Sequence, residues 1–176
     1  EEADIFVINT CTVTSRSDQK TRKIIRNLKR TYPKAFIVIT GCYAERAAKE
    51  LESMPEVDLV IGNKDKQKIA YQVHSILYDS SSFCPSLDRK EVNFLHSSIS
   101  EFHNHTRAFI KIQDGCESFC SYCIIPYVRG PLKSKPEEIV VEEAKKLIQY
   151  NVKEIVLVGI HLGQYGKETT SLSLYS

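Results

Sequence analysis

Apolar positions in the first eighty residues form short continuous runs separated by stretches with helical spacing. The short runs, rich in β-branched residues, occupy positions 4–9, 36–40 and 57–61. Helically spaced apolar residues fill the first interval up to Pro33, and two further helices are expected at 44–54 and 66–78. Strands that alternate with helices favour parallel βαβ units with right-handed crossovers, so the predicted fold class is α/β.

The pattern changes near position 80 and then returns. Residues 81–105 are polar and rich in serine, which indicates a linker, with one short strand expected near 92–95. A strand at 107–112, a helix at 136–150 and a strand at 154–159 follow. The predicted organisation is therefore a first domain at 1–80, the linker, and the start of a second domain at 106–176.

Composition and charge narrow the class of protein. The chain has 176 residues, 42% apolar and 26% charged, with a formal charge of +2, which is typical of a globular protein and excludes a disordered one. No apolar run is long enough to cross a bilayer and no apolar leader opens the chain, so we expect a cytoplasmic protein without a membrane partner. Any contact with nucleic acid must come from a local basic surface.

Three of the six cysteines crowd into one loop. Cys116, Cys120 and Cys123 lie within eight residues, directly after the strand predicted at 107–112. Ligand sites in parallel α/β folds lie at the carboxyl ends of strands, and three thiolates suit a cubane iron–sulfur cluster with one open iron. A zinc site completed by His103 or His105 is the alternative. Disulfides are disfavoured because the chain has strong strand-like runs and no signal segment.

Two more cysteines occupy equivalent places in the first domain. Cys11 and Cys42 each follow a predicted strand by two residues and precede a helix. Because the carboxyl ends of neighbouring parallel strands lie at one edge of a sheet, we expect the two thiols side by side, where they can share a ligand. The alternative is two unrelated buried thiols, which are common in protein cores.

These motifs together resemble a known enzyme family. The segment from Asp114 to Pro126 is similar to the signature loop of radical S-adenosylmethionine enzymes, and its continuation to Pro131 is similar to the methylthiotransferases. Residues 9–14 and 40–44 resemble the second and third cysteine motifs of that family's amino-terminal domain. The resemblance implies a methylthiotransferase domain followed by the beginning of a radical S-adenosylmethionine barrel of the partial TIM type.

The resemblance also implies cofactors. Two [4Fe-4S] clusters are expected, the first held by Cys116, Cys120 and Cys123 together with S-adenosylmethionine, the second by Cys11 and Cys42. The family has a further cysteine upstream, and this sequence has none before Cys11, so the second cluster is expected to be incomplete here and the chain to be an inactive fragment. Cys84 is expected to be a spare thiol. An external electron donor is implied.

The expected reaction is the addition of a methylthio group to C2 of an adenosine in transfer RNA. Residues 159–166 resemble the branch that acts on N6-threonylcarbamoyladenosine; the isopentenyladenosine and ribosomal-protein branches are the alternatives. Tyr122 and Gly159 are expected to contact the cofactor, although simple packing and an ordinary turn explain them equally well. The residues expected to contact the substrate are Arg129, Lys133, Lys135 and His161.

A basic segment agrees with an RNA partner. Between positions 16 and 34 the chain carries eight Lys and Arg residues and a single anion, Asp18. Such a surface binds phosphates without regard to sequence. A solvated helix face is the alternative. A non-catalytic module, either an iron–sulfur electron carrier or a zinc-stabilised RNA binder, is the competing interpretation of the whole chain.

Overall fold

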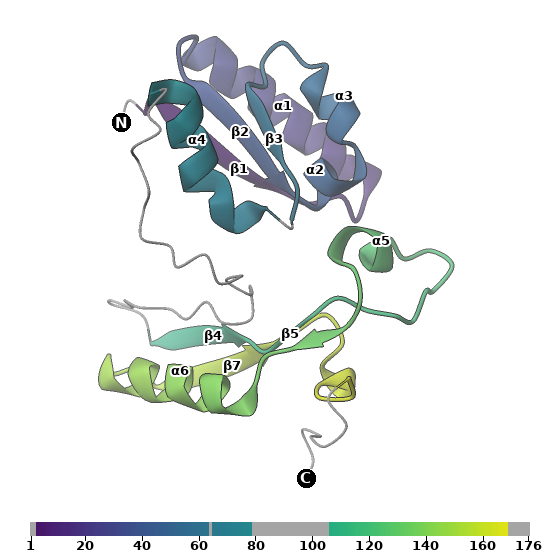
Figure 1. The fold of residues 1–176 in the computed structure, drawn as a ribbon, viewed down its shortest axis with the longest axis vertical. Helices are drawn as coiled ribbons and strands as arrows, with labels where there is room; N and C mark the ends of the chain where they lie inside the picture. The colour runs from purple at the N-terminus through teal and green to yellow at the C-terminus, as the bar shows by residue number, and fades with distance from the viewer. Residues whose placement is uncertain (1–2, 64, 79–105, 169–176) are drawn as a thin grey trace. The chain divides into compact units, whose positions relative to one another are not determined.

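The computed structural model describes residues 3–63, 65–78 and 106–168, which fall into two compact units (Figure 1). The first unit comprises Glu1–Leu87 with Cys120–Arg129, and the second comprises Asp88–Phe119 with Gly130–Ser176. Segment 120–129 thus packs with the first unit, although the predicted boundary assigned it to the second domain. Several predictions lie outside the described residues: the linker with its strand near 92–95, Cys84, and His103 and His105 as alternative zinc ligands.

The first unit is built on a parallel three-stranded sheet. Its strands are β1 (Ile5–Thr10), β2 (Phe36–Gly41) and β3 (Leu59–Ile61), in the order β1-β2-β3. The pairing of β1 with β2 runs in register from Ile5 opposite Phe36 to Thr10 opposite Gly41. The predicted α/β class with parallel βαβ units is confirmed for this unit.

The helices of the first unit differ from the prediction at one point. Helix α1 (Ser15–Thr31) begins where the Thr14 hydroxyl accepts a hydrogen bond from the Ser17 N–H. The single helix expected at 44–54 is instead two short helices, α2 (Cys42–Arg46) and α3 (Ala48–Glu52), because Ala47 between them leaves helical geometry at φ −136° and ψ 45°. Helix α4 (Ile69–Tyr78) follows a 3₁₀ turn at Lys66–Lys68.

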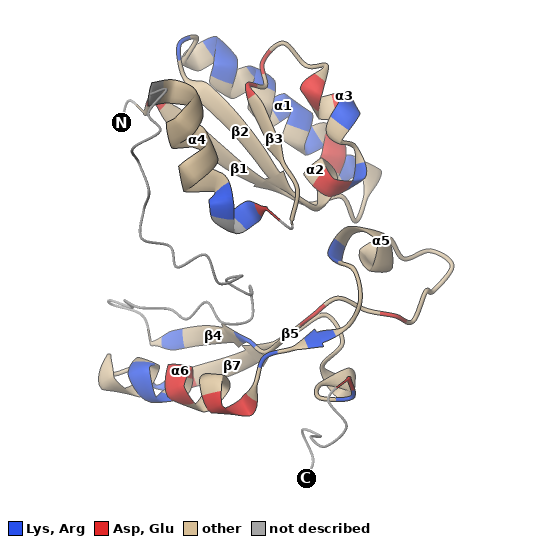
Figure 2. Cartoon of the chain, in the orientation of Figure 1, with Lys and Arg blue, Asp and Glu red and all other residues tan. Residues whose placement is uncertain are grey.

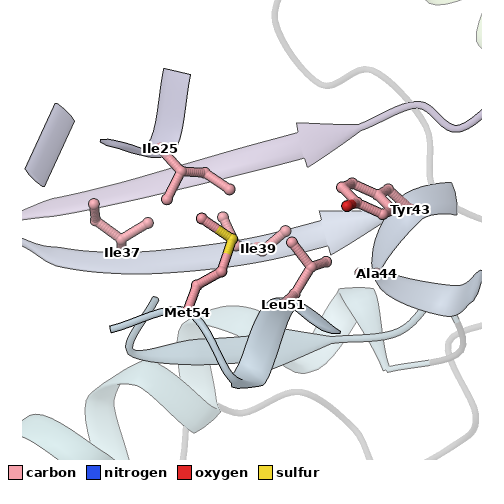
Figure 3. Packing of buried hydrophobic residues seen from close by; sticks show 7 residues of the cluster. All are labelled: Ile25, Ile37, Ile39, Tyr43, Ala44, Leu51 and Met54. Atoms are coloured by element: carbon pink, nitrogen blue, oxygen red, sulfur yellow. The ribbon is translucent and has the colours of Figure 1, made fainter. Parts of the chain in front are cut away.

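The alternation of side chains along β2 creates two cores, one on each face of the sheet. On one face Ile37 and Ile39 pack with Ile25 of α1, Leu51 of α3 and the nearby Met54 (Figure 3). On the opposite face the cluster contains Val38, Ile61 and Val73, the last of these from α4. The sheet is therefore covered by helices on both sides, as parallel sheets require, and its carboxyl edge remains for ligands.

In its described residues, the second unit is built on a parallel strand pair and one α-helix. Strands β4 (Arg107–Lys111) and β7 (Glu154–Val158) pair in parallel, and α6 (Glu137–Gln149) connects them in sequence. Buried residues of the β4 strand and of α6 form its core with Ile112 and Val152. This βαβ unit matches the predicted elements, and closure into a barrel stays a prediction.

Four short elements of the described residues were not predicted. Strands β5 (Gln113–Asp114) and β6 (Lys133–Ser134) form an antiparallel pair in the second unit, where η3 (Leu162–Gln164) follows β7. Helix α5 (Ile125–Arg129) belongs to the first unit. Among the described residues no helix is long and apolar enough to cross a membrane.

Candidate functional site

The carboxyl ends of β1 and β2 bring the first two cysteine motifs to one edge of the sheet. Thr10 lies opposite Gly41 in the parallel ladder. Cys11 directly follows Thr10, and Cys42 directly follows Gly41. The Thr10 hydroxyl donates a 2.6 Å hydrogen bond to the Thr40 carbonyl oxygen, which ties the two strand ends together. Cys42 is buried and Cys11 is exposed, so the pair borders both the core and solvent.

Gly41 allows the close approach of these strand ends. Its φ of +99° and ψ of −165° lie in a region that only glycine adopts readily. A Cβ at this position would lie 2.3 Å from the Thr10 carbonyl oxygen. The glycine before Cys42 is therefore a geometric requirement of the cysteine edge.

Two buried hydroxyls beside these cysteines have no hydrogen-bond partner among the described residues. They are Thr12 Oγ1, one residue after Cys11, and Thr40 Oγ1, two residues before Cys42. Buried polar atoms in proteins nearly always have a partner, so unpaired hydroxyls next to both thiols fit a polar group bound at this edge. Neither threonine was among the predicted site residues; their position next to the cysteines was the available signal.

The end of the cysteine loop packs against the same edge within the first unit. Arg129 Nε, at the end of α5, donates a 3.0 Å hydrogen bond to Cys42 Sγ. The Asn63 side-chain amide donates a 2.7 Å hydrogen bond to the Val128 carbonyl oxygen. Arg129, predicted to contact the substrate, thus contacts a predicted cluster ligand.

Two thiols of the loop belong to the first unit and are accessible. Cys120 is exposed, Cys123 is half-buried, and the Cys123 N–H donates a hydrogen bond to the Cys120 carbonyl oxygen at 2.9 Å. Tyr122 between them is 90% exposed. Its ring is therefore free to contact a ligand, and packing within the described residues does not account for its position.

The third thiol of the loop belongs to the second unit and is electrostatically tuned. Hydrogen bonds from the Ser118 side chain and backbone lower the pKa of the Cys116 thiol below its ordinary value. The ring of His161 lies beside it, with Nδ1 3.9 Å from Cys116 Sγ. Since thiolates are the form that binds metals, this environment favours ligation.

A buried glutamine organises the residues around Cys116. Gln113 is fully buried, and its amide nitrogen donates to the Asp114 and Gly115 carbonyl oxygens at 2.9 and 2.8 Å. Its carbonyl oxygen accepts a 2.7 Å hydrogen bond from the His161 N–H. Gln113 therefore holds the backbone at the start of the loop and at His161. Gln113 was not among the predicted site residues; its position directly after an apolar strand was the available signal.

Gly159 has a packing role next to this glutamine. A Cβ at Gly159 would lie 2.8 Å from a Leu162 methyl carbon and 2.9 Å from the Gln113 side chain. The absence of a side chain thus leaves room for Gln113, which is an alternative to the predicted approach of a cofactor.

The two lysines of the β6 segment have different environments. Lys133 is exposed, whereas Lys135 is buried and forms a 2.6 Å ion pair with the equally buried Glu143 of α6. The Lys135 ammonium is therefore inside the second unit and does not present a surface charge to a substrate phosphate. Lys135 was expected to contact the substrate because it lies near the loop in sequence, but its burial keeps the ammonium away from the surface.

Most of the basic segment forms α1, along which Lys and Arg residues are spread (Figure 2). Some of these cations form ion pairs within the described residues and others do not, and Arg26 lies 4.0 Å from Glu56. Arg22 and Lys29 form ion pairs with Glu50 and Asp58, at 2.5 and 3.0 Å, and these pairs hold α1 to its own unit. Exposed cations without a described ion pair are Arg16, Lys20, Lys23 and Arg30. A surface with unpaired cations thus remains on α1, although it carries fewer free charges than the eight Lys and Arg residues of the segment suggest.

No three His, Cys, Asp or Glu side chains of residues 3–63, 65–78 and 106–168 are gathered in a way that would hold a metal ion. The boundary between the two units falls between Phe119 and Cys120, so Cys116 is described with one unit and the other two loop thiols with the other. The ligand assignments therefore rest on the chemistry of the donor sets.

Comparison with known proteins identifies relatives over almost the whole chain. Residues 1–62 match the model of the uncharacterized protein family UPF0004. The chain is 39% identical over 170 residues to a threonylcarbamoyladenosine tRNA methylthiotransferase of Bacillus subtilis, which covers 96% of this chain and 38% of the relative. It is 41% identical over 167 residues to the protein of that name from Aquifex aeolicus, covering 93% and 40%.

A relative from another branch is less similar. The tRNA-2-methylthio-N(6)-dimethylallyladenosine synthase of Clostridium novyi is 32% identical over 173 residues, covering 95% of this chain and 38% of the relative. The chain thus spans about two fifths of the length of these relatives. By sequence, the chain is therefore similar to methylthiotransferases, and the two relatives of higher identity bear the threonylcarbamoyladenosine tRNA name.

Proposed function

We propose that this chain is part of a radical S-adenosylmethionine methylthiotransferase that adds a methylthio group to C2 of N6-threonylcarbamoyladenosine in transfer RNA. The observation that carries the proposal is the paired cysteine edge, where Cys11 and Cys42 directly follow Thr10 and Gly41, which lie opposite each other in the parallel ladder of β1 and β2. The loop of three further thiols supplies a second donor set in the same chain.

The residues of both donor sets fit iron–sulfur ligation. Thiolates are the usual cluster ligands, and the lowered pKa of Cys116 favours the thiolate. At the paired edge, the buried hydroxyls of Thr12 and Thr40 have no partner within the described part of the chain, and a bound polar group would supply one. Cys116, Cys120 and Cys123 would hold one cluster, and Cys11 and Cys42 would contribute to the other. When bound, the two clusters and S-adenosylmethionine supply the radical, the sulfur atom and the methyl group.

Other residues of the chain orient these donors. Gln113 fixes the Gly115 carbonyl and the His161 N–H, so Cys116 leaves β5 in a defined direction. Tyr122 is exposed and available to stack on the adenine ring of the cofactor. Gly159 leaves room for Gln113, and it acts on the cofactor site through that glutamine.

The RNA surface of the proposal is α1. Its unpaired cations Arg16, Lys20, Lys23 and Arg30 face solvent and suit the phosphate backbone, and Lys133 adds a cation near the loop. Lys135 is left out because its ammonium is neutralised by Glu143. The relatives whose names specify tRNA support the same partner. An external donor must supply the electron that starts the reaction.

Anaerobic reconstitution of the complete gene product with iron and sulfide tests the cofactor assignment. The proposal expects a cubane absorption and electron paramagnetic resonance spectrum that changes when S-adenosylmethionine is added. Bound zinc with no response to S-adenosylmethionine would contradict the proposal and favour a zinc-stabilised RNA binder. An iron–sulfur spectrum that ignores S-adenosylmethionine would favour an electron carrier.

The substrate is tested by nucleoside analysis. Reconstituted protein is incubated with reductant and transfer RNA carrying either threonylcarbamoyladenosine or isopentenyladenosine, and the digested nucleosides are analysed by mass spectrometry. A methylthio product only from the threonylcarbamoyladenosine RNA is expected. A product only from the isopentenyladenosine RNA would contradict the assigned branch.

A further inference from the structure

Helix α5 is fastened to the cysteine edge of the first unit by polar contacts. The Asn63 side chain donates to the Val128 carbonyl oxygen at 2.7 Å, and the Asn63 N–H donates to Glu45 Oε2 of α2 at 2.8 Å. Pro126 and Val128 of α5 are buried. The short helix that follows the loop cysteines is thus held by residues of α2 and of the segment after β3.

This anchoring places a guanidinium on a predicted cluster ligand. Arg129 is half-buried, and its Nε donates a 3.0 Å hydrogen bond to Cys42 Sγ. Cys42 is only 3% exposed, so this contact is largely shielded from water. A cation that donates a hydrogen bond to a sulfur inside a protein interacts with it far more strongly than it would at the surface.

We propose that Arg129 is a positioning residue for the cluster bound through Cys42, on which it acts by donating a hydrogen bond to the ligand sulfur. The proposal rests on the proposed function, since it assumes that Cys42 ligates a cluster. It assigns Arg129 a role in the second cluster in place of the substrate contact expected from the sequence.

The hydrogen bond from Arg129 should change how easily the cluster accepts an electron. Reduction makes the cluster and its thiolates more negative, and hydrogen bonds to the sulfurs together with nearby positive charge stabilise that state. Arg129 therefore raises the reduction potential of the Cys42 cluster. Lysine keeps the charge but lacks the planar fork that fixes the direction of the Nε–H, so it preserves only part of the effect.

The test uses the complete gene product with Cys116, Cys120 and Cys123 replaced by alanine, so that only the second cluster can form. In that background Arg129→Leu and Arg129→Lys are compared with the parent by iron content and by redox titration monitored with electron paramagnetic resonance. We expect Arg129→Leu to retain iron and to lower the ratio of reduced to oxidised cluster at a fixed potential by about tenfold, a shift of about 59 mV for one electron. Arg129→Lys should shift less in the same direction.

Two further variants separate this effect from general damage. Arg107→Leu removes an exposed guanidinium that pairs with Glu154 and should leave the potential unchanged. Asn63→Ala releases α5 without touching Cys42 and should shift the potential in the same direction as Arg129→Leu.

The outcomes distinguish the inference from the proposed function. A parent that binds no iron in this background overturns the second cluster and the role of Arg129 with it. A parent that binds iron while Arg129→Leu leaves the potential unchanged overturns the role of Arg129 alone. An unchanged potential combined with weaker binding of transfer RNA would assign Arg129 to the substrate.

Discussion

Replacement of Gly41 by alanine tests the geometry of the paired cysteine edge. The backbone there has φ +99° and ψ −165°, a conformation that costs a non-glycine residue about 1–3 kcal/mol. The new Cβ would also lie 2.3 Å from the carbonyl oxygen and 2.6 Å from the backbone nitrogen of Thr10, so the strand ends must move apart. Overpacking of this kind costs about 1–3 kcal/mol. The variant should therefore lose about 2–6 kcal/mol of stability in the first unit.

Gly130→Ala is the matched control. Gly130 also has a positive φ, +77°, but a Cβ there would meet no atom within 4 Å. Its cost should be that of the backbone alone, about 1–2 kcal/mol. Hydrogen–deuterium exchange with mass spectrometry of peptides from β2 reports the opening free energy of the first unit for Gly41→Ala, and peptides from β4 report that of the second unit for Gly130→Ala. The reasoning would be refuted if Gly41→Ala lowered the opening free energy by less than about 0.5 kcal/mol, or by no more than Gly130→Ala does.

Three further predictions concern the second unit and the basic helix. Glu143→Leu should cost about 3–5 kcal/mol in chemical denaturation because the buried Lys135 ammonium loses the carboxylate of its ion pair, and Lys135→Met in addition should recover most of the loss; equal loss in both would contradict the ion pair's role. Ser118→Ala should raise the pKa of Cys116 in the metal-free protein, so that alkylation of Cys116 at neutral pH slows; an unchanged rate would count against the hydrogen bonds. Lys23→Ala should reduce the slope of log affinity for transfer RNA against log salt by about 0.9, and an unchanged slope would remove Lys23 from the interface.

Local patterns in the sequence predicted the elements that position the cysteines. Runs of β-branched residues and helical spacing placed β1, β2 and α1, and the equivalent positions of Cys11 and Cys42 after their strands followed from that alternation. The break at Ala47 was not predictable, because the apolar spacing continues through it. Local sequence sets periodicity, whereas tertiary packing decides where a short helix is interrupted.

Contacts between distant residues account for the remaining differences. Arg129 and Lys135 both lie close to the cysteine loop in sequence, and both were expected at the substrate. In the structure, Arg129 donates a hydrogen bond to the Cys42 sulfur, 87 residues away along the chain, and Lys135 pairs with the carboxylate of Glu143. A cation's partner depends on burial and on the fold, so no local pattern distinguishes a phosphate contact from an internal one.

The most direct test of the two proposed cluster sites is the iron content of two variants of the complete gene product, each with one cysteine replaced. Cys120→Ala removes a ligand of the loop cluster, and Cys42→Ala removes a ligand of the paired cysteine edge. If the two donor sets hold separate clusters, each variant should retain about half of the parent's iron after anaerobic reconstitution, and only Cys42→Ala should retain the spectral response to S-adenosylmethionine. Full iron retention by Cys42→Ala, or loss of all iron from either variant, would contradict the two separate sites.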